Sequence, residues 1–427
     1  MKNNFLKSTI ILLIGGLLTK VLGMIIKIIL ARLISPKALG MYMLILPTFT
    51  LLISLSSFSI PLALSKLISE NNRNNKRLVL SIIPISIIIN VILIILIVIL
   101  APIISNKLLH NNDTYISILS MSLVIPFTSI SSICRSYFFG KQKMLPHVLS
   151  NIIEDIVRLL IIVIGIPIIK PLGLKYIVCF LVLINIISEV ISTVILIIFL
   201  PKNIKIKKED LLPNKSYIKD SLKICIPNTT SKLIGSIGFF LEPIILTNIL
   251  IKNNSINYIT TEYGIITAYV IPLILLPSFF TLALSQSVLP VISKYSVTNN
   301  IKEIKRKTNQ VILLSILIGL PVTIILFLKG ELLLQLIYHT NKGVNYLKIL
   351  APICLLQYIQ SPLASILDAL NKSKDNLKIT ILGTLTRTIS LIIFSNRGIY
   401  SLIISISLNV LITTFYQIKK VRHYLTF

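Results

Sequence analysis

The sequence predicts an all-α polytopic membrane protein of about twelve transmembrane helices, arranged as two six-helix lobes around a central cleft. Three observations support this fold class. Of the 427 residues, 55% are hydrophobic and only 13% are charged, whereas a soluble globular chain carries about a quarter charged residues. Apolar runs of about 20 residues, which as helices span a bilayer, follow one another along the chain. Finally, landmarks of the first half recur in the same order in the second half.

Twelve apolar runs are predicted to cross the membrane, because each is close to the length that a spanning helix needs. They lie at about residues 8–30, 40–65, 78–104, 115–138, 148–169, 174–200, 221–250, 264–290, 309–328, 345–370, 378–395 and 399–418. Several runs contain proline, which frees a backbone carbonyl inside a helix, so we expect kinks there. These prolines are Pro47, Pro61, Pro84, Pro126, Pro272, Pro277 and Pro321.

The longest polar interval divides the runs six and six. We therefore predict an N-lobe over residues 1–200, a basic connector over 201–220 and a C-lobe over 221–427. The connector is rich in lysine, and alternate loops along the chain are also basic. Positive charge stays on the cytoplasmic side of membrane proteins, so both termini and the connector are predicted to be cytoplasmic in a multi-pass cell-membrane protein.

An internal repeat relates the two halves. The motif KVLG from Lys20 to Gly23 recurs as KLIG from Lys232 to Gly235, and Arg158 and Arg387 both precede Leu/Ile runs. Six spans in each copy give both copies the same orientation, so their pseudo-twofold axis runs along the membrane normal. A pair of bundles related in this way is expected to enclose a central cleft.

Several function classes are disfavoured. The net charge of +28 comes from short basic clusters between apolar runs and forms no continuous basic face, so no nucleic-acid partner is predicted. The four cysteines lie singly and the four histidines lie in loops or at the C-terminal tail, so neither a metal site nor a cofactor is predicted. No nucleophile elbow or phosphate loop occurs, and the chain is therefore not expected to be an enzyme.

Four cations are candidates for substrate-binding residues in the cleft: Lys20, Lys27, Lys232 and Arg387. An ionisable side chain at membrane depth costs about 2.5–3.5 kcal/mol or more, so it needs a cavity or a partner. Lys20 and Lys27 are seven residues apart and share one helix face, which cannot face lipid. Such a cationic stripe would attract an anionic head group such as a pyrophosphate.

A second group, Glu154, Arg158, Arg135 and Glu242, consists of candidates for coupling or structural ion pairs. Glu154 and Arg158 are spaced four residues apart on one helix, so they can neutralise each other. Arg135 lies near a predicted span end, from which it can extend to water. Glu242 stands in mid-span before Pro243, and it is either a coupling-ion or proton site or the partner of a cleft lysine.

Several motifs together resemble a known family. They are Thr19 to Gly23, Ala31 to Leu33, Ile60 to Glu70, Arg135 to Gly140, Glu154 to Arg158, Pro272 to Pro277 and Ala283 to Ser293. In this order they resemble the polysaccharide-transporter, or stage V sporulation protein B-like, branch of the multidrug/oligosaccharidyl-lipid/polysaccharide flippase superfamily. The resemblance covers essentially the whole chain. Members of this branch typically carry fourteen spans, whereas twelve apolar runs are found here, and in related flippases the last pair can form a groove for the lipid tail.

The resemblance implies a flippase that moves a polyprenyl-(pyro)phosphate-linked saccharide, a peptidoglycan or polysaccharide precursor, to the outer leaflet by alternating access. In related lipid II flippases the cations of the first span line the cavity, a role that falls here on Lys20, with Lys27 as a second candidate. The expected partners are the lipid bilayer, this substrate and cell-wall synthesis proteins, in sporulation or in cell-wall synthesis.

Three alternatives remain open from the sequence. A cation-coupled drug or metabolite exporter on the same scaffold would need an acidic cleft, for which Glu242 is the suitable mid-span acid of the second half. A membrane enzyme would need essential acids in the exterior loops. A scaffold protein of cell-wall assembly would need neither.

Overall fold

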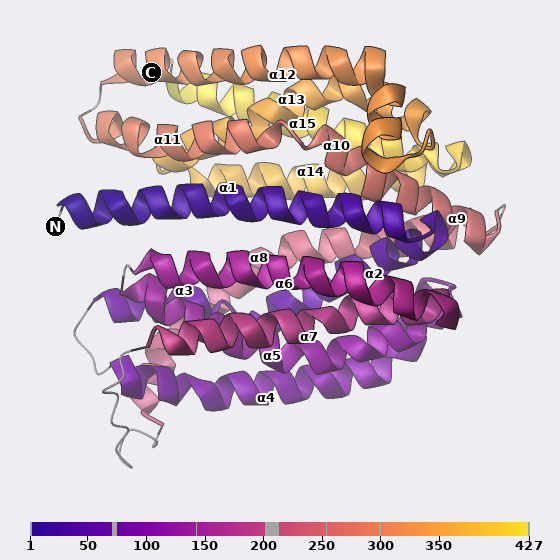
Figure 1. The fold of residues 1–427 in the computed structure, drawn as a ribbon. Helices are drawn as coiled ribbons and strands as arrows, with labels where there is room; N and C mark the ends of the chain where they lie inside the picture. Colours follow the sequence, from indigo (N-terminus) through magenta and orange to yellow (C-terminus); the bar gives the residue numbers. More distant parts are fainter. Residues whose placement is uncertain are drawn as a thin grey trace. The chain divides into compact units, whose positions relative to one another are not determined.

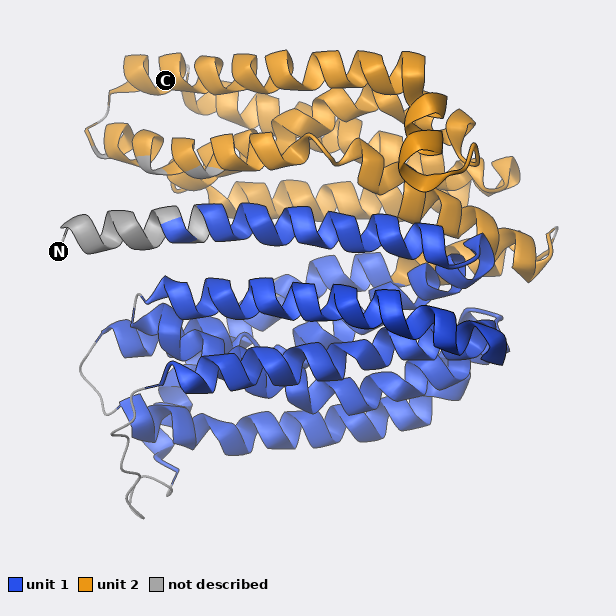
Figure 2. Cartoon of the chain, viewed as in Figure 1, with its two compact units in different colours: residues 1–240 blue, residues 241–427 orange. Residues whose placement is uncertain are grey.

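The computed structural model describes residues 2–70, 75–141, 143–200, 213–252, 254–298 and 300–425, and nearly all of these are helical. No strand occurs within these ranges, which confirms the predicted all-α class. The chain forms two compact units, residues 1–240 and residues 241–427, shown in two colours in Figure 2. The boundary falls inside a helix, whereas the sequence placed the lobe boundary at the connector. Residues 201–212 of that connector lie outside the described part, and the predicted lobe limits stay a prediction.

Unit 1 contains helices that follow the first six apolar runs (Figure 1). Their bounds are α1 Lys2–Leu33, α2 Pro36–Ser57, α3 Ile60–Ser69, α4 Asn75–Pro102, η1 Ile103–Leu108, η2 Asn112–Thr114, α5 Tyr115–Gly140, α6 Met144–Ile169, η3 Lys170–Leu172 and α7 Leu174–Ile198. The first part of α8, Lys215–Leu250, also belongs to unit 1. The reason is its packing: Cys225 is buried in an apolar cluster with residues of α3, α4 and α5.

Unit 2 contains the end of α8 and the helices that follow it. Their bounds are α9 Ile256–Gly264, η5 Ile265–Val270, α10 Ile271–Ile274, α11 Ser278–Val297, α12 Ile301–Tyr338, α13 Val344–Ala369, α14 Ser373–Ile393, η6 Ser395–Arg397 and α15 Tyr400–Leu425. The central helix of this unit is α13, which packs against α11, α12 and α15. Buried Val288, Leu363 and Val421 belong to one apolar cluster between these helices.

The described residues contain ten helices long and apolar enough to cross a membrane, and an eleventh if one bent helix pair counts as a single span. Helix α6 is as long as these spans, but Glu154, Asp155 and Arg158 stand in its middle. With α6 the total reaches the twelve predicted spans. The chain is therefore a multi-pass membrane protein.

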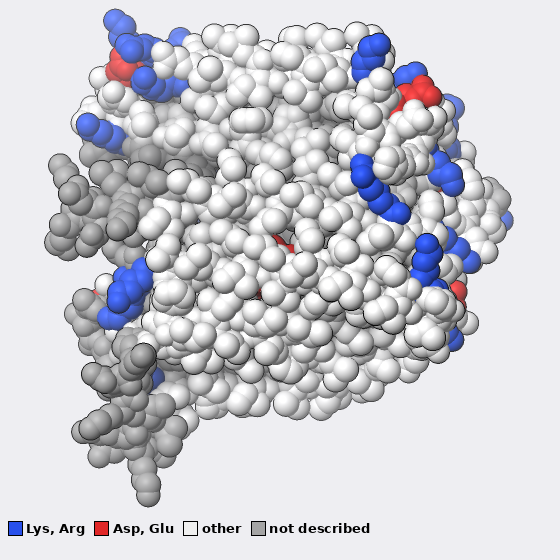
Figure 3. Space-filling model, in the orientation of Figure 1, with Lys and Arg blue, Asp and Glu red and all other residues white. Residues whose placement is uncertain are grey.

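Exposed apolar stripes show which helix faces are suited to lipid. On α4 the exposed residues Ile88, Ile92, Ile95 and Ile99 follow helical spacing and form one continuous face. A continuous exposed apolar face of this kind is unfavourable in water but compatible with the acyl chains of a bilayer. On the face shown in Figure 3, lysine and arginine side chains lie towards the helix ends of each unit, and the helix middles are almost free of charge. This distribution is the one expected of a membrane protein.

The second apolar run, about residues 40–65, is not a single helix. It breaks between α2 and α3, where Phe58 and Ser59 both adopt left-handed backbone angles, with φ of 43° and 47°. Pro61 stands in the first turn of α3, a position that proline favours because its missing N–H has no partner there in any case. Pro61, at which a kink was expected, lies at the start of a helix instead.

The eighth apolar run is also broken. The segments Ile256–Ile274 and Ser278–Ser296 form the bent pair, with an angle of 55° between them. The break leaves the carbonyl of Ile274 outside a regular helix, and the buried Tyr358 hydroxyl on α13 donates a hydrogen bond to it at 2.7 Å. Irregular backbone at membrane depth persists only where protein groups satisfy it, so Tyr358 stabilises this break.

Replacing Tyr358 with phenylalanine should therefore destabilise the bent pair. The change removes one hydroxyl and leaves a buried carbonyl without a donor, which costs about 1–3 kcal/mol. The thermal midpoint of unfolding in detergent is expected to fall by several degrees. Tyr416→Phe on the exposed surface of α15 is the matched control and should leave the midpoint unchanged. Equal midpoints for Tyr358→Phe and the wild type would show that another group satisfies the carbonyl.

Candidate functional site

Three helices of unit 1 meet in a cluster of charges in which Glu154 is buried and the two arginines are partly buried. Arg135 of α5 places its Nη2 atom 2.6 Å from Oε2 of Glu154 on α6 and 2.9 Å from Oε2 of Glu189 on α7. The same nitrogen donates a hydrogen bond to the hydroxyl of Ser192 at 3.0 Å. Arg135 therefore does not extend alone to water, as the sequence allowed, because two carboxylates of neighbouring helices hold it inside the bundle.

The second arginine of the cluster is Arg158, which lies on the same helix as Glu154. Its Nη2 is 2.6 Å from Oε1 of Glu154, and its Nη1 is 3.2 Å from Oδ1 of Asp155. Glu154 is thus shared by Arg135 and Arg158, one oxygen for each. The spacing of four residues that predicted the Glu154–Arg158 pair gives this contact directly, while the links to α5 and α7 arise only on folding.

The helix face that carries Lys20 and Lys27 is exposed and open. Both side chains are exposed, and neither has a hydrogen-bond or ion-pair partner among the residues that the structure describes. Gly16 and Gly23 lie on the same face, and a side chain added at either would meet no atom within 4 Å. The backbone of α1 is therefore accessible beside both ammonium groups.

The repeated motif shows the same local features. Lys232 on α8 is exposed, and a side chain added at Gly235 would also meet nothing within 4 Å. In both copies a lysine without a partner among the described residues is followed after one helical turn by an open glycine. The substrate-binding role of these three lysines stays a prediction.

Unit 2 contains a buried ion pair between helices α8 and α14. Oε2 of Glu242 on α8 lies 2.5 Å from Nε of Arg387 on α14, and the Glu242 side chain is only 5% exposed. Oε1 of Glu242 accepts a long hydrogen bond of 3.5 Å from the buried hydroxyl of Tyr263. The sequence allowed Glu242 to be either a coupling-ion or proton site or the partner of a cleft lysine. In the structure Glu242 forms an ion pair, and the partner is an arginine rather than a lysine.

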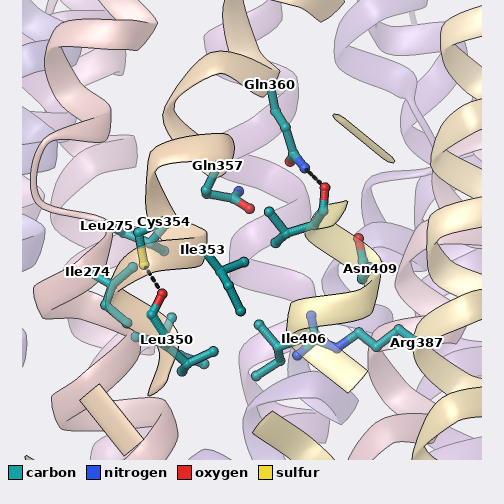
Figure 4. A pocket seen from close by; sticks show the side chains of 12 residues that line it. Ile274, Leu275, Leu350, Ile353, Cys354, Gln357, Gln360, Arg387, Ile406 and Asn409 are labelled. Carbon is teal, nitrogen blue, oxygen red and sulfur yellow. Dashed lines mark hydrogen bonds between the residues drawn. The ribbon is translucent and has the colours of Figure 1, made fainter. Parts of the chain in front are cut away.

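A pocket opens beside this ion pair. It has a volume of about 260 Å³, and it lies between α10, α13, α14 and α15 (Figure 4). Arg387 lines it together with the amides of Gln357, Gln360 and Asn409. The sequence analysis did not single out these three amides, because isolated amides in apolar helices carry no spacing signal. Within the described ranges, no group of three or more His, Cys, Asp or Glu side chains is placed to hold a metal ion.

Comparison with known proteins shows which families and relatives this chain resembles. The family model of polysaccharide biosynthesis proteins matches residues 5–296, and the MatE model matches residues 243–393. Stage V sporulation protein B of Bacillus subtilis is 29% identical over 407 residues, which cover 93% of this chain and 79% of that protein. The lipid II flippase MurJ of the same organism is 21% identical over 434 residues, covering 91% of this chain and 77% of the flippase.

Solved structures show the same fold. A lipid II flippase MurJ in an inward closed conformation has a TM-score of 0.74 at 17% identity, with 96% of this chain and 87% of that chain covered. An inward-facing multidrug resistance MATE family transporter of the MOP superfamily also has a TM-score of 0.74, at 16% identity, with 96% and 94% covered. The family model spans more than half of the sequence, and the chain belongs to the polysaccharide biosynthesis protein family.

Proposed function

We propose that the chain is a flippase for a lipid-linked saccharide in the cell membrane, with both termini on the cytoplasmic side. The observation that carries this proposal is the open face of α1, where Lys20 and Lys27 have no partner in the described part of the chain and lie beside accessible backbone. Two ammonium groups seven residues apart suit the phosphates of a polyprenyl-pyrophosphate carrier. The names of the curated relatives, a lipid II flippase among them, support the same substrate class.

The proposed mechanism is alternating access. The lysines of α1 hold the phosphate while the polar saccharide crosses the membrane, and the polyprenyl tail stays in the bilayer. Opening to one membrane face and then to the other requires two conformations of different affinity for the substrate. Lys232, which repeats the Lys20 motif, is the candidate for a second phosphate contact.

The state of the buried acids favours this function over a cation-coupled exporter. An exporter of that kind needs a membrane-embedded acid that is free to bind and release an ion. Glu154 and Glu242 are both buried, and each is already within 2.6 Å of an arginine nitrogen. The cations of α1, in contrast, have no counter-charge among the described residues.

Reconstitution in phospholipid vesicles tests the proposal. The purified chain should accelerate the transfer of a fluorescent undecaprenyl-pyrophosphate-linked saccharide between leaflets, measured by loss of protection from a membrane-impermeant quencher. A labelled phosphatidylcholine in the same vesicles should show no acceleration. Equal rates for both lipids would identify a non-selective scramblase, and no transfer of either would contradict the proposal. Cation-driven efflux of a drug from the vesicles would instead support the exporter.

A further inference from the structure

The pocket of unit 2 is lined by one cationic side chain, three side-chain amides and several apolar side chains. Its walls are aliphatic side chains of α10, α13 and α15, and its polar groups converge on the space between them (Figure 4). Pockets for drug-sized ligands occupy roughly 300–1,000 Å³. A volume of about 260 Å³ therefore suits a group no larger than a single sugar ring.

Arg387 is only partly neutralised within the chain. Glu242 approaches its Nε atom at 2.5 Å, and among the described residues this is the one ion pair or hydrogen bond of the guanidinium. The guanidinium reaches from α14 to a position beside Ile406, at the edge of the pocket (Figure 4). The Nε side of the guanidinium thus faces Glu242. Its two terminal nitrogens, Nη1 and Nη2, are available to bind an oxyanion with two parallel hydrogen bonds.

A close approach of two helices brings Arg387 to this position. Gly383 lies one turn before Arg387 on α14, and a side chain there would clash with the Thr413 hydroxyl of α15. Because glycine has no side chain, α14 can lie directly against the part of α15 that carries Asn409. The arginine and the amide therefore border the same cavity.

The three amides offer both donors and acceptors. Nε2 of Gln360 donates to the carbonyl of Val410 and to the hydroxyl of Thr414, so its Oε1 remains as an acceptor. Oδ1 of Asn409 accepts from Thr413, which leaves Nδ2 as a donor. Gln357 has no partner within the described residues and offers both groups. A ligand that satisfies this set carries an anion together with hydroxyl groups.

We propose that this pocket binds a single acidic sugar residue. Its carboxylate or phosphate binds the free edge of Arg387, its hydroxyl groups bond to Gln357, Gln360 and Asn409, and its carbon skeleton packs against the aliphatic walls. This inference rests on the proposed function and extends it. It adds that the transported saccharide is acidic. Glu242 partly neutralises Arg387 from its Nε side and repels the anion of the ligand, so Glu242 lowers the affinity of the pocket for an acidic sugar.

Equilibrium binding to the purified full chain in detergent tests this inference without any transport step. Glucuronate and glucose 1-phosphate are the acidic probes, glucose is the neutral probe, and acetate tests the acid group alone. The wild type should bind either acidic sugar at least about tenfold more tightly than glucose or acetate, a difference of about 1.4 kcal/mol. Similar affinity for all four probes, or no binding of the acidic sugars, would overturn the proposal.

Variants identify the residues that bind. Glu242→Gln releases Arg387 and should increase affinity for the acidic sugars several-fold. The double variant Glu242→Gln/Arg387→Gln removes both charges, which avoids leaving one unpaired, and should bind acidic sugars and glucose equally. Gln357→Leu should weaken binding of all the sugars, whereas Gln335→Leu on the exposed surface of α12 should not. A double variant that still prefers acidic sugars would exclude Arg387 as the anion site, even if the chain flips its lipid normally.

Discussion

Replacing Lys20 and Lys27 together with glutamine should reduce leaflet transfer of an undecaprenyl-pyrophosphate-linked saccharide by at least about tenfold. Glutamine keeps the length and polarity of the side chain but removes its charge. Hydrogen bonds to charged groups each contribute about 1.5–3 kcal/mol, so the loss of two such bonds lowers affinity for the phosphates by well over tenfold. The initial transfer rate in vesicles, measured below saturating substrate, reports this loss.

Two controls separate loss of binding from loss of charge in general. Lys20→Arg/Lys27→Arg retains both cations and should keep most of the transfer rate. Lys302→Gln/Lys305→Gln removes two exposed cations at the start of α12 and should have the wild-type rate. If the Lys20 and Lys27 double variant inserts normally and transfers substrate at the wild-type rate, α1 does not bind the phosphate.

Glu154→Gln should lower the free energy of unfolding by about 3–5 kcal/mol. Arg135 keeps Glu189 and Arg158 keeps Asp155. The cost therefore comes from the two charge-assisted contacts of Glu154 that are lost, each worth about 1.5–3 kcal/mol. Here two arginines lose a partner at once, because one oxygen of Glu154 binds Arg135 and the other binds Arg158. Chemical unfolding in detergent micelles, followed by helical circular dichroism, measures the change.

The surface pair Glu303–Arg306 on α12 is the matched control for this experiment. Its atoms are 3.0 Å apart, but its side chains are 26% and 62% exposed, so the pair should contribute only about 0–1 kcal/mol. Glu303→Gln should therefore leave stability nearly unchanged. Comparable losses for Glu303→Gln and Glu154→Gln would show that the cluster of unit 1 is not a stabilising core of the bundle.

Much of the fold could be predicted from the sequence, because a bilayer imposes a length of about 20 apolar residues on every span. What the pattern could not show is where a run breaks. Phe58 and Ser59 look like ordinary members of an apolar run, and their left-handed conformation depends on the start of α3 at its N-terminal proline. Likewise, the break after Ile274 depends on a tyrosine hydroxyl supplied by a distant helix.

Within the candidate sites, only contacts between residues close together on one helix could be predicted from the sequence. Glu154 and Arg158 are neighbours on one helix, and their pair follows from the sequence. The contact of Arg135 with Glu189 joins α5 to α7, and that of Glu242 with Arg387 joins α8 to α14. Such contacts depend on how helices pack, about which one sequence carries little information. For the same reason the pocket amides of α13 and α15 became apparent only in the folded chain.

Photo-crosslinking from position 23 tests the central claim most directly. Gly23 lies between Lys20 and Lys27 on the open face of α1, where an added side chain meets no atom within 4 Å. A photoreactive amino acid placed there should crosslink to a lipid-linked saccharide, and excess unlabelled pyrophosphate-linked lipid should abolish the product. The same group at Ile92, on the exposed apolar face of α4, should crosslink only to bulk lipid and without competition. A position 23 product insensitive to the competitor, or no saccharide-bearing product at all, would contradict the assignment of this face to the substrate.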